Sequence, residues 1–372
     1  MRQRALQTVL LVHAIEQTDL AGDALSLEDR VHASREAADG RPLPAAAAAA
    51  APLDGDSERF LVRRADDLLG RLRVRSPGVD HVLGAASGPT GLDRVLLLAA
   101  LALGFGVAFA DGTRIDIFAY PLMGLVLWNL VVYITLTVRT IGALRRGRPG
   151  TGTAEPDGQE SAVAQRDGFL RRWLARRYAN RVRARIDALI THSIGFNAPL
   201  APGLRRFAAD WWEVGRPVFR ERARRLLHTA AILAAVGLMA GYAVRGWVMR
   251  QAAGWGATVF GPASAHTALV TLYGAASAVS GVPVPSTHDL QALAWTSPTS
   301  GGGPAGPWIY LIDWTALLYI VVPRLIGVIV TTINLWRRSA TLRAPSSLSR
   351  HLGAVVRSMP PSPEPPPAGS SG

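Results

Sequence analysis

The sequence predicts an all-α, polytopic membrane protein with four transmembrane helices. The first observation behind this prediction is a set of long apolar runs, separated by polar segments, at 95–110, 117–138, 226–244 and 308–336. A helix needs roughly 20 apolar residues to cross a bilayer core of about 30 Å. The second observation is composition: 49% of the 372 residues are hydrophobic and only 18% are charged. The mean hydropathy of +0.19 also suits a membrane protein with sizeable aqueous parts.

The distribution of arginine is the third observation and predicts the topology. With four spans and both termini in the cytoplasm, the cytoplasmic segments contain 12 arginines in 1–94, 19 in 139–225 and five in 337–372. The outer segments contain three. Positively charged residues accumulate on the cytoplasmic side of membrane proteins. We therefore expect a multi-pass protein of a bacterial inner (plasma) membrane with both termini inside.

Residues 1–92 are predicted to form a cytoplasmic helical segment, interrupted by a proline- and alanine-rich linker at 42–56. Ser26, followed by two acidic residues, is typical of an N-cap that opens a helix towards Ala38. Ser57 is placed to cap a further helix that continues to Arg75. This segment is expected to be a small bundle of helices.

The first two apolar runs are predicted to form a transmembrane hairpin within 93–138. The run 95–110 has 16 residues and the run 117–138 has 22, and neither contains a charged residue. Only six residues separate them. So short a connection forces two helices to lie antiparallel.

The segment 139–225 is predicted to be a basic cytoplasmic loop, with 19 arginines against eight acidic residues. Within it, 169–190 is typical of an amphipathic helix, because apolar residues recur every four positions and arginines fill most of the others. Such a helix can pack against the N-terminal helices, lie on anionic lipid or bind nucleic acid. Nucleic acid is the least favoured of the three, since positive charge is expected beside membrane spans.

The rest of the chain is predicted to contain two more spans. A helix that begins near Pro217 leads into the third span, 226–246, where Gly237 and Gly241 have the spacing of a helix-packing motif. The loop 247–307 is expected outside the cytoplasm, with a helix at 263–279 lying at the membrane interface. The fourth span is 308–336, and the tail 337–372, rich in proline, serine and glycine towards its end, is expected to be disordered.

Four polar residues within or beside the spans are candidate site residues. Arg324 lies near the middle of the fourth span, directly after Pro323, and a charge at that depth costs roughly 2.5–3.5 kcal/mol on insertion scales. It can contact a substrate or ion, or it can be a packing charge that binds carbonyls freed by the proline. Asp313 lies about 16 Å away along a helix, so we expect Asn129 or His228 to be better partners.

Composition argues against an enzyme. All 40 basic residues are arginine, and the chain contains neither lysine nor cysteine. These absences exclude lysine-based nucleophiles, P-loop lysines, thiolate nucleophiles and cysteine-based metal sites. The eight histidines show no metal-ligand spacing, and neither HExxH nor GxSxG occurs. We therefore predict no catalytic residues, no cofactor and no metal.

Several short stretches follow one another along the chain in a distinctive order. They are Glu16 with Leu25-Ser26-Leu27-Glu28-Asp29-Arg30 and Ala33 near the start, then Ala240-Gly241-Tyr242-Ala243-Val244-Arg245-Gly246, Ala253-Gly254-Trp255, Ser280-Gly281-Val282-Pro283-Val284-Pro285 and Val321-Val322-Pro323-Arg324-Leu325. In their order and spacing these stretches resemble a bacterial membrane-protein family catalogued as domain-of-unknown-function family 2868, and the resemblance covers most of 5–340. Members of that family have no assigned activity and are often encoded beside a predicted membrane-associated GTPase, which implies such a GTPase as a partner.

These observations favour a membrane-embedded interaction or assembly component that docks a partner, such as the GTPase, through its cytoplasmic helices. The alternative is a subunit of a channel or transporter that uses Arg324. Four spans are few for a lone transporter, and no inverted repeat is visible in the sequence. The alternative therefore requires a homo-oligomer.

Overall fold

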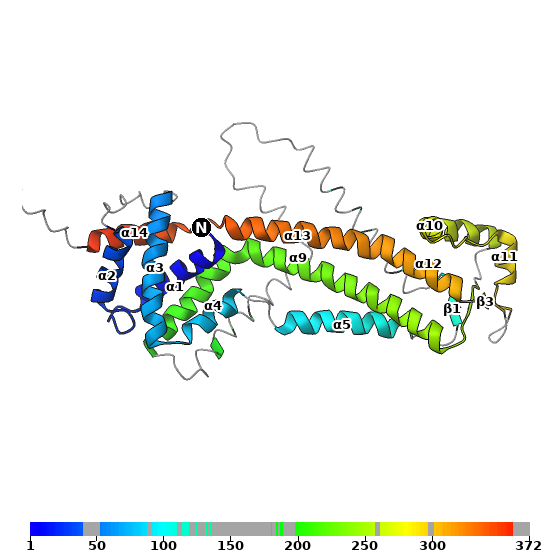
Figure 1. The fold of residues 1–372 in the computed structure, drawn as a ribbon, viewed down its shortest axis with the longest axis horizontal. Coiled ribbons are helices and arrows are strands. Elements are labelled where there is room, and N and C mark those ends of the chain that lie inside the picture. Colours follow the sequence, from blue (N-terminus) through cyan, green and yellow to red (C-terminus); the bar gives the residue numbers. More distant parts are fainter. Residues whose placement is uncertain are drawn as a thin grey trace, which may run out of the picture. The chain divides into compact units, whose positions relative to one another are not determined.

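The computed structural model of the chain describes residues 1–39, 53–87, 91–109, 114–118, 198–256, 261–296 and 301–359, together with isolated residues between 124 and 188. The chain is mostly helical (Figure 1). It divides into two compact units. Unit 1 comprises Met1–Thr90, Gly168–Arg222 and Ile333–Gly372, and unit 2 comprises Gly91–Asp167 and Ala223–Thr332.

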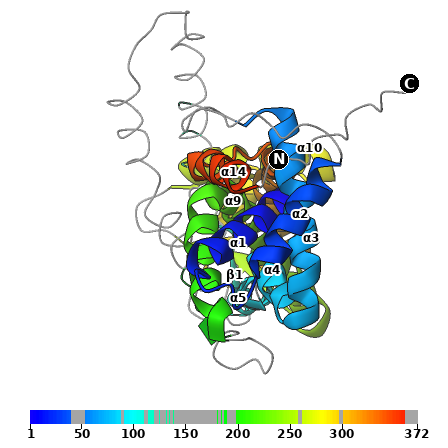
Figure 2. The same cartoon turned by 90° about the vertical axis from the view of Figure 1, so that its left-hand side faces the viewer.

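Unit 1 is a helical bundle built around its first helix. In α1, every residue from Leu6 to Ile15 is buried, including the polar Gln7, Thr8 and His13. Figure 2 shows α1 between α9 and the α2–α3 pair. Gly203 of α9 lies so close to α1 that a Cβ there would come within 2.8 Å of Cα of Ile15. The elements of unit 1 are α1 (Gln3–Thr18), α2 (Leu27–Ala38), α3 (Gly55–Arg75), α4 (Val79–Ser87), η1 (Ala198–Leu200), the first part of α9 (Ala201–Val248), the end of α13 (Val322–Ala340) and α14 (Ser346–Ser358).

Side-chain caps set the starts of the N-terminal helices. The predicted cap of α2 is confirmed: the Ser26 hydroxyl accepts from the Asp29 N–H at 3.1 Å, and the Asp29 carboxylate accepts from the Ser26 N–H in return. For α3 the predicted cap was wrong. The helix begins at Gly55, where Asp54 accepts from the Ser57 N–H at 2.8 Å. The predicted linker therefore ends two residues earlier than 56, and its part 42–52 lies outside the described residues.

The C-terminal segment contains a helix where the sequence prediction placed only disorder. The segment 346–358 forms α14, and its apolar residues Leu348, Leu352 and Val355 are buried in the core of unit 1. These three residues recur at i, i+4 and i+7, which is the pattern of a helix with one buried face. The prediction for 337–372 gave weight to the nearby prolines, but one of them, Pro345, is the N-cap of this helix, and the others lie after it. Residues 360–372 lie outside the described part.

Unit 2 adds a small sheet to its helices, which the all-α prediction missed. In the sheet, β1 (Arg114–Asp116) pairs in parallel with β2 (Ala252–Gly254), and β2 pairs antiparallel with β3 (Gly303–Pro304). These strands have only two or three residues, too short for a period-2 pattern to stand out in sequence. Among the described residues, the helices of unit 2 are α5 (Gly91–Val107), the second part of α9, α10 (Pro262–Ser280), α11 (Thr287–Ala292), α12 (Gly306–Ala316), η2 (Leu317–Val321) and the first part of α13.

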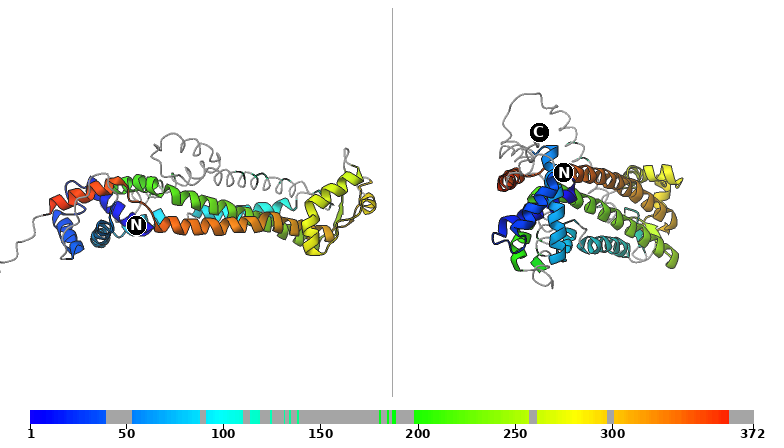
Figure 3. Two further views of the ribbon diagram at one scale, coloured as in Figure 1. Left: turned by 90° about the horizontal axis from the view of Figure 1, so that it is seen from above. Right: turned by 60° about the vertical axis from the view of Figure 1, so that its left-hand side comes forward.

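Aromatic residues join the sheet of unit 2 to the neighbouring helices. The Tyr273 hydroxyl donates to the Ile117 carbonyl at 2.8 Å, and the Trp255 ring N–H donates to the Leu290 carbonyl at 2.7 Å. Tyr273 in α10 also meets Trp308 in α12 edge to face, with ring centroids 6.0 Å apart. Figure 3 shows α10 beside α12. The predicted interfacial helix at 263–279 is thus a helix at 262–280, held by α12.

Two helical stretches in the described residues are long and apolar enough to cross a bilayer, by length and composition. They are Ala201–Val248, with 48 residues, and Gly306–Ala340, with 35, and only 28% and 22% of their most apolar windows are buried. The first begins at Ala201, well before the expected start at Pro217, which lies inside the helix. Of the predicted span 95–110, the part 95–107 lies in α5, a helix of 17 residues that ends at Val107. The predicted span 117–138 lies mostly outside the described residues, so four spans stay a prediction.

The last long helix changes its winding just before its proline. The segment Leu317–Val321 is a π-helix, in which the Val322 N–H donates to the Leu317 carbonyl. Within an α-helix, the ring of Pro323 would clash with the carbonyl four residues earlier. A π-bulge widens the turn at this point. The helix therefore continues through Pro323 as α13.

Glycines allow α5 and α9 to approach closely in unit 2. A Cβ on Gly104 of α5 would overlap the backbone of Ala234 of α9, and a Cβ on Gly237 would overlap the Leu101 carbonyl. At Gly241 a Cβ would come within 2.6 Å of the Ala108 Cβ. The glycines that the sequence placed at helix-packing spacing thus lie at the contact with α5. Only residues without a side chain fit at this distance.

Candidate functional site

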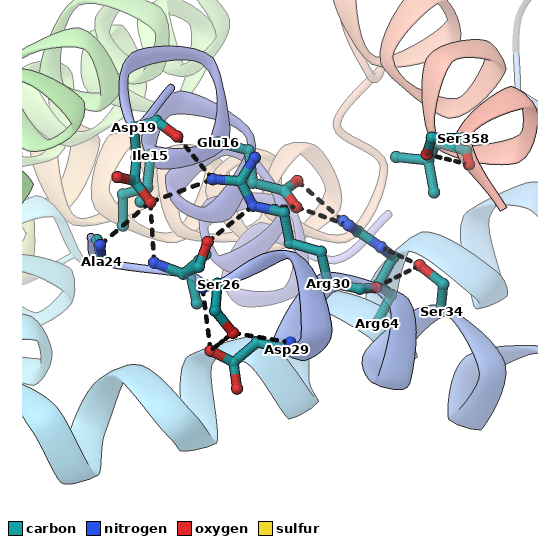
Figure 4. A network of polar contacts seen from close by, with 12 residues as sticks. Ile15, Glu16, Asp19, Ala24, Ser26, Asp29, Arg30, Ser34, Arg64 and Ser358 are labelled. Carbon is teal, nitrogen blue, oxygen red and sulfur yellow. Dashed lines mark hydrogen bonds and ion pairs between the residues drawn. The ribbon is translucent and has the colours of Figure 1, made fainter. Parts of the chain in front are cut away.

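A buried carboxylate, that of Glu16, lies at the meeting point of four helices of unit 1 (Figure 4). It lies near the end of α1 and faces Arg64 of α3 and His351 of α14. Ser34 of α2 completes the cluster, because it accepts a hydrogen bond from Nε of Arg64 at 2.9 Å. We refer to Glu16, Ser34, Arg64 and His351 as the Glu16 cluster.

Arg64 donates two hydrogen bonds to the Glu16 carboxylate, one from each terminal nitrogen of its guanidinium group. Nη1 lies 2.9 Å from Oε2, and Nη2 lies 2.6 Å from Oε1. Nε2 of His351 lies 3.1 Å from Oε2. The side chains of Glu16 and Arg64 are only 6% and 4% exposed. Burial alone would raise the pKa of Glu16, but hydrogen bonds from His351 and Arg64 outweigh burial and lower the pKa to about 2.

A second histidine extends the Glu16 cluster into the core. The ring of His13 lies 4.4 Å from the ring of His351, centroid to centroid, with 59° between the planes. His13 is fully buried, and its Nδ1 has no hydrogen-bond partner in the described part of the chain. Burial, together with the neighbouring His351, lowers the pKa of His13 to about 3. His13 is therefore neutral at physiological pH.

A companion set of ion pairs fixes the loop between α1 and α2. Asp19 accepts backbone hydrogen bonds from Asp23, Ala24 and Leu25 at 2.8 to 3.2 Å, and Arg30 reaches the same carboxylate at 3.1 Å. Burial would raise the pKa of Asp19, but these backbone donors outweigh it and lower the pKa. Figure 4 shows Arg30 between Asp19 and Glu16.

The Glu16 cluster borders a cavity of about 270 Å³, lined also by Arg30, Leu27 and Met359. The chemistry available there is limited. A carboxylate that already accepts from a guanidinium and an imidazole, and whose pKa lies near 2, is a poor proton acceptor at neutral pH. Among the residues that the structure describes, no group of three or more histidine, aspartate or glutamate side chains could hold a metal ion. The geometry favours a polar junction that fixes four helices to one another.

Sequence reasoning missed the Glu16 cluster because its members are far apart in the chain. Arg64 follows Glu16 by 48 residues, and His351 belongs to the segment that was expected to be disordered. One signal was present: Glu16 follows an almost uninterrupted run of apolar residues, so burial of that helix brings a charge into the core. A charge in such a place requires a partner.

Unit 2 brings together two of the predicted intramembrane residues. Nη1 of Arg324 in α13 lies 3.4 Å from Nδ1 of His228 in α9. Gly327, one turn later, makes room for the imidazole, because a Cβ there would come within 2.9 Å of the ring. A guanidinium group can only donate, so in this contact Nδ1 of His228 is in the position of the acceptor.

The other predicted site residues lie elsewhere. Asp313 belongs to α12, on the far side of the π-helix from Arg324, and its Oδ1 atom is buried without a hydrogen-bond partner among the described residues. Asn129 lies outside the described residues. So does the predicted basic helix at 169–190, apart from four isolated helical residues, one of which, Asp187, pairs with Arg205 at 3.6 Å.

An arginine that the topology prediction merely counted as extracytoplasmic is buried in unit 2. Arg245 is 1% exposed, donates to the Ala108 carbonyl just beyond the end of α5, and lies 5.8 Å from the ring of Phe109 and 5.9 Å from that of Tyr242. Carbonyls at a helix C-terminus lack intrahelical donors, and a positive charge there interacts favourably with the helix dipole. Arg245 therefore closes the end of α5.

Comparison with known proteins adds no relative: no family model matches the chain, and neither a curated protein nor a solved structure matches it. The resemblance to domain-of-unknown-function family 2868 therefore rests on the sequence stretches alone. It stays a prediction.

Proposed function

We propose that the protein is an integral membrane protein that acts as an interaction or assembly component. The supporting observation is the combination, in one chain, of two long helices whose most apolar windows are mostly not buried and a separately packed helical unit. Apolar surface of that extent is unfavourable in water and favourable in lipid. In this proposal unit 1 is the part that recruits a partner.

The chemistry of unit 1 supports a binding role over a catalytic one. The Glu16 side chain, which is only 6% exposed, already has its oxygens occupied by Arg64 and His351. The remaining details of the proposal come from the sequence: four spans, both termini in the cytoplasm of a bacterial inner membrane, and a membrane-associated GTPase as the partner, the last from the family resemblance.

Affinity purification of the tagged full chain from native membranes tests this proposal. We expect a GTP-binding protein to be recovered in stoichiometric amounts with the natural chain and with Arg324→Ala, which alters unit 2. We expect it to be lost with Arg64→Met, which disrupts the core of unit 1, and kept with Arg63→Met as the matched surface control. Recovery of no GTP-binding protein with the natural chain would contradict the proposal.

The second candidate function, a subunit of an oligomeric channel or transporter, is favoured by the contact between Arg324 and His228. Ionisable residues inside membrane spans commonly mark ion or substrate pathways. This alternative predicts that Arg324→Ala inserts normally but abolishes a solute-dependent growth phenotype. Arg343→Ala, which removes an arginine outside the predicted span, should leave the phenotype unchanged. Equal phenotypes for the two variants would exclude this function for Arg324.

A further inference from the structure

A cavity of unit 1 lies beside the end of the predicted fourth span. It has a volume of about 870 Å³ and is lined by the first turn of α1, by parts of α3 and α4, and by the last turns of α13. The lining residues that matter here are Arg2, Arg4, Arg73, Asp80, Trp336 and Ser339. We refer to this cavity as the Arg2–Trp336 pocket.

The Arg2–Trp336 pocket has a surplus of positive charge. Arg73 is neutralised by Asp80, to which it donates three hydrogen bonds of 2.8 to 3.0 Å. Arg2 and Arg4 are exposed. Within the described ranges, neither of these two guanidinium groups has a hydrogen-bond or salt-bridge partner. The pocket therefore presents two guanidinium groups that an anion can engage.

The N-terminal backbone holds these two arginines beside α13. The Met1 amino group donates to the Leu342 carbonyl at 3.2 Å and lies 3.3 Å from the Glu58 carboxylate. Arg2 is the next residue, and Arg4 belongs to the first turn of α1. These two contacts of Met1 fix the backbone next to Arg2 and Arg4.

Another lining residue of the pocket, Trp336, is typical of a membrane–water interface. Trp336 ends the predicted fourth span and is 72% exposed. Tryptophan is enriched at the headgroup level of bilayers. Guanidinium groups bind phosphate oxygens through paired hydrogen bonds. A phospholipid offers this combination of chemistry, because its phosphate is attached to apolar chains.

We propose that the Arg2–Trp336 pocket binds the phosphate of an anionic phospholipid headgroup, with Arg2 and Arg4 as its ligands and Trp336 against the glycerol backbone. The inference rests on the proposed membrane embedding of Gly306–Ala340. A free phosphate ion has the same anionic group, but it would gain nothing from Trp336. The bound lipid would tie unit 1 to the membrane surface.

Native mass spectrometry of the detergent-solubilised full chain tests the proposal, with phosphatidylglycerol as the titrated probe. The natural chain is expected to retain one phosphatidylglycerol more firmly than any phosphatidylcholine. In Arg2→Gln/Arg4→Gln, affinity should fall about 30-fold, since each arginine near a lipid surface contributes a roughly five-fold gain. The control Arg35→Gln/Arg357→Gln removes the same charge from exposed positions outside the pocket and should bind like the natural chain.

A second pair of variants blocks the pocket without changing its charge. Gly84 lines the pocket, and a Cβ there would meet no atom within 4 Å, so Gly84→Phe can place a ring in the cavity without a backbone clash. Gly70 is an exposed helical glycine with equally open surroundings, outside the pocket. Gly84→Phe should lose the lipid and Gly70→Phe should keep it. Equal lipid retention by both would overturn the proposal.

Competition with inorganic phosphate shows whether the ligand of the pocket is a lipid or a free phosphate ion. If millimolar inorganic phosphate displaces nothing, and phosphatidylglycerol stays bound only to chains with Arg2 and Arg4, the lipid source is supported. If inorganic phosphate binds at Arg2 and Arg4 but no lipid is retained, the lipid proposal is wrong. Extraction of membranes at alkaline pH separates the two hypotheses: a chain released into the supernatant refutes the embedding, whereas a retained chain without bound lipid refutes only the pocket.

Discussion

Unit 1 and unit 2 are both helical, but different interactions hold their helices together. In unit 1, buried charged groups such as Glu16 and Arg64 join helices that are distant in sequence. In unit 2, the contact between α5 and α9 depends on glycines, and its buried polar contacts use arginine and aromatic side chains against backbone carbonyls. The difference follows from the surroundings that we expect for each unit, which are water for unit 1 and lipid for unit 2. Close backbone packing does not depend on water, so it suits helices in lipid.

Of the changes that test this comparison, breaking the Glu16 cluster should cause the largest loss of stability. Arg64→Met leaves the buried Glu16 carboxylate without its main partner, which destabilises a protein by about 3–5 kcal/mol. The matched control is Arg63→Met, because Arg63 pairs with Asp39 at the surface, where both side chains are more than half exposed. Its cost should be below about 1 kcal/mol. Hydrogen exchange of the α1 amides measures the stability loss in each variant. Equal protection in Arg64→Met and Arg63→Met would contradict the role of the Glu16 cluster in holding unit 1 together.

Breaking the glycine contact of unit 2 should give the next largest effect. Gly104→Leu places a side chain into the backbone of Ala234 and should cost about 3 kcal/mol, the upper range for overpacking. Gly106→Leu, on the same helix, meets no atom within 4 Å and is the control. The measurement is the temperature at which half of the detergent-solubilised chain aggregates. If Gly106→Leu lowers it as much as Gly104→Leu, the packing argument fails.

Mild acid should lower the stability of unit 1 more than that of unit 2. Among the described residues, only unit 1 contains a buried histidine with a strongly shifted pKa. The pKa of His13 is lowered by burial from 6.5 to about 3, so between these values the unfolded chain binds a proton that the folded chain does not. Stability is therefore complete above pH 6.5 and falls by up to about 1.4 kcal/mol per pH unit below it. Glu16 adds acid sensitivity only below about pH 4.5, the ordinary pKa from which it is lowered.

The measurement is exchange protection of α1 between pH 5 and 7, where Glu16 does not contribute. The groups around His13 are His351, Glu16, Arg206 and Arg350. In His13→Leu the slope should flatten, whereas His32→Leu, at an exposed position, should keep the natural slope. An unchanged slope in His13→Leu would show that another group is responsible.

The smallest expected effect compares two identical capping boxes, one in each unit. Ser26 and Asp29 cap α2, and Ser286 and Asp289 cap α11. Ser26→Ala removes the side-chain cap of α2 and should cost about 1 kcal/mol of stability. Asp29, the partner of Ser26 in this capping box, also accepts a hydrogen bond from Arg75 at 2.7 Å. Ser286→Ala should cost less, since α11 has six residues and its cap is exposed. Denaturant unfolding of the full chain compares the two, and a larger loss for Ser286→Ala would reverse the ranking.

Local signals in the sequence were sufficient to predict where many of the helices lie. The capping pattern at Ser26 located the start of α2, and the apolar run at 308–336 lies within Gly306–Ala340. Helix 263–279 was also recognised, one residue short at each end. These features depend on neighbouring residues, and the periodicity of the chain records them directly.

Features that depend on distant residues could not be predicted in the same way. In unit 2, β1 pairs with β2 across more than a hundred residues and β2 pairs with β3 across about fifty. In unit 1, His351 joins Glu16 only because α14 returns to the core. The proximity of His228 to Arg324 was anticipated among several alternatives, because few polar residues were available at that depth. Arg245 was read as a topological marker, since its sequence neighbours reveal nothing of the carbonyl it meets.

The π-helix before Pro323 has a consequence for how the last long helix is used. Eleven residues of uninterrupted α-helix would place Asp313 and Arg324 on nearly the same stripe. One additional residue in a turn shifts the angular register by about 100°. Asp313 and Arg324 therefore point to different sectors around the axis, so the part that packs on α10 and the part that meets His228 are not one continuous face. A single continuous helix thus serves two interfaces whose registers are set independently.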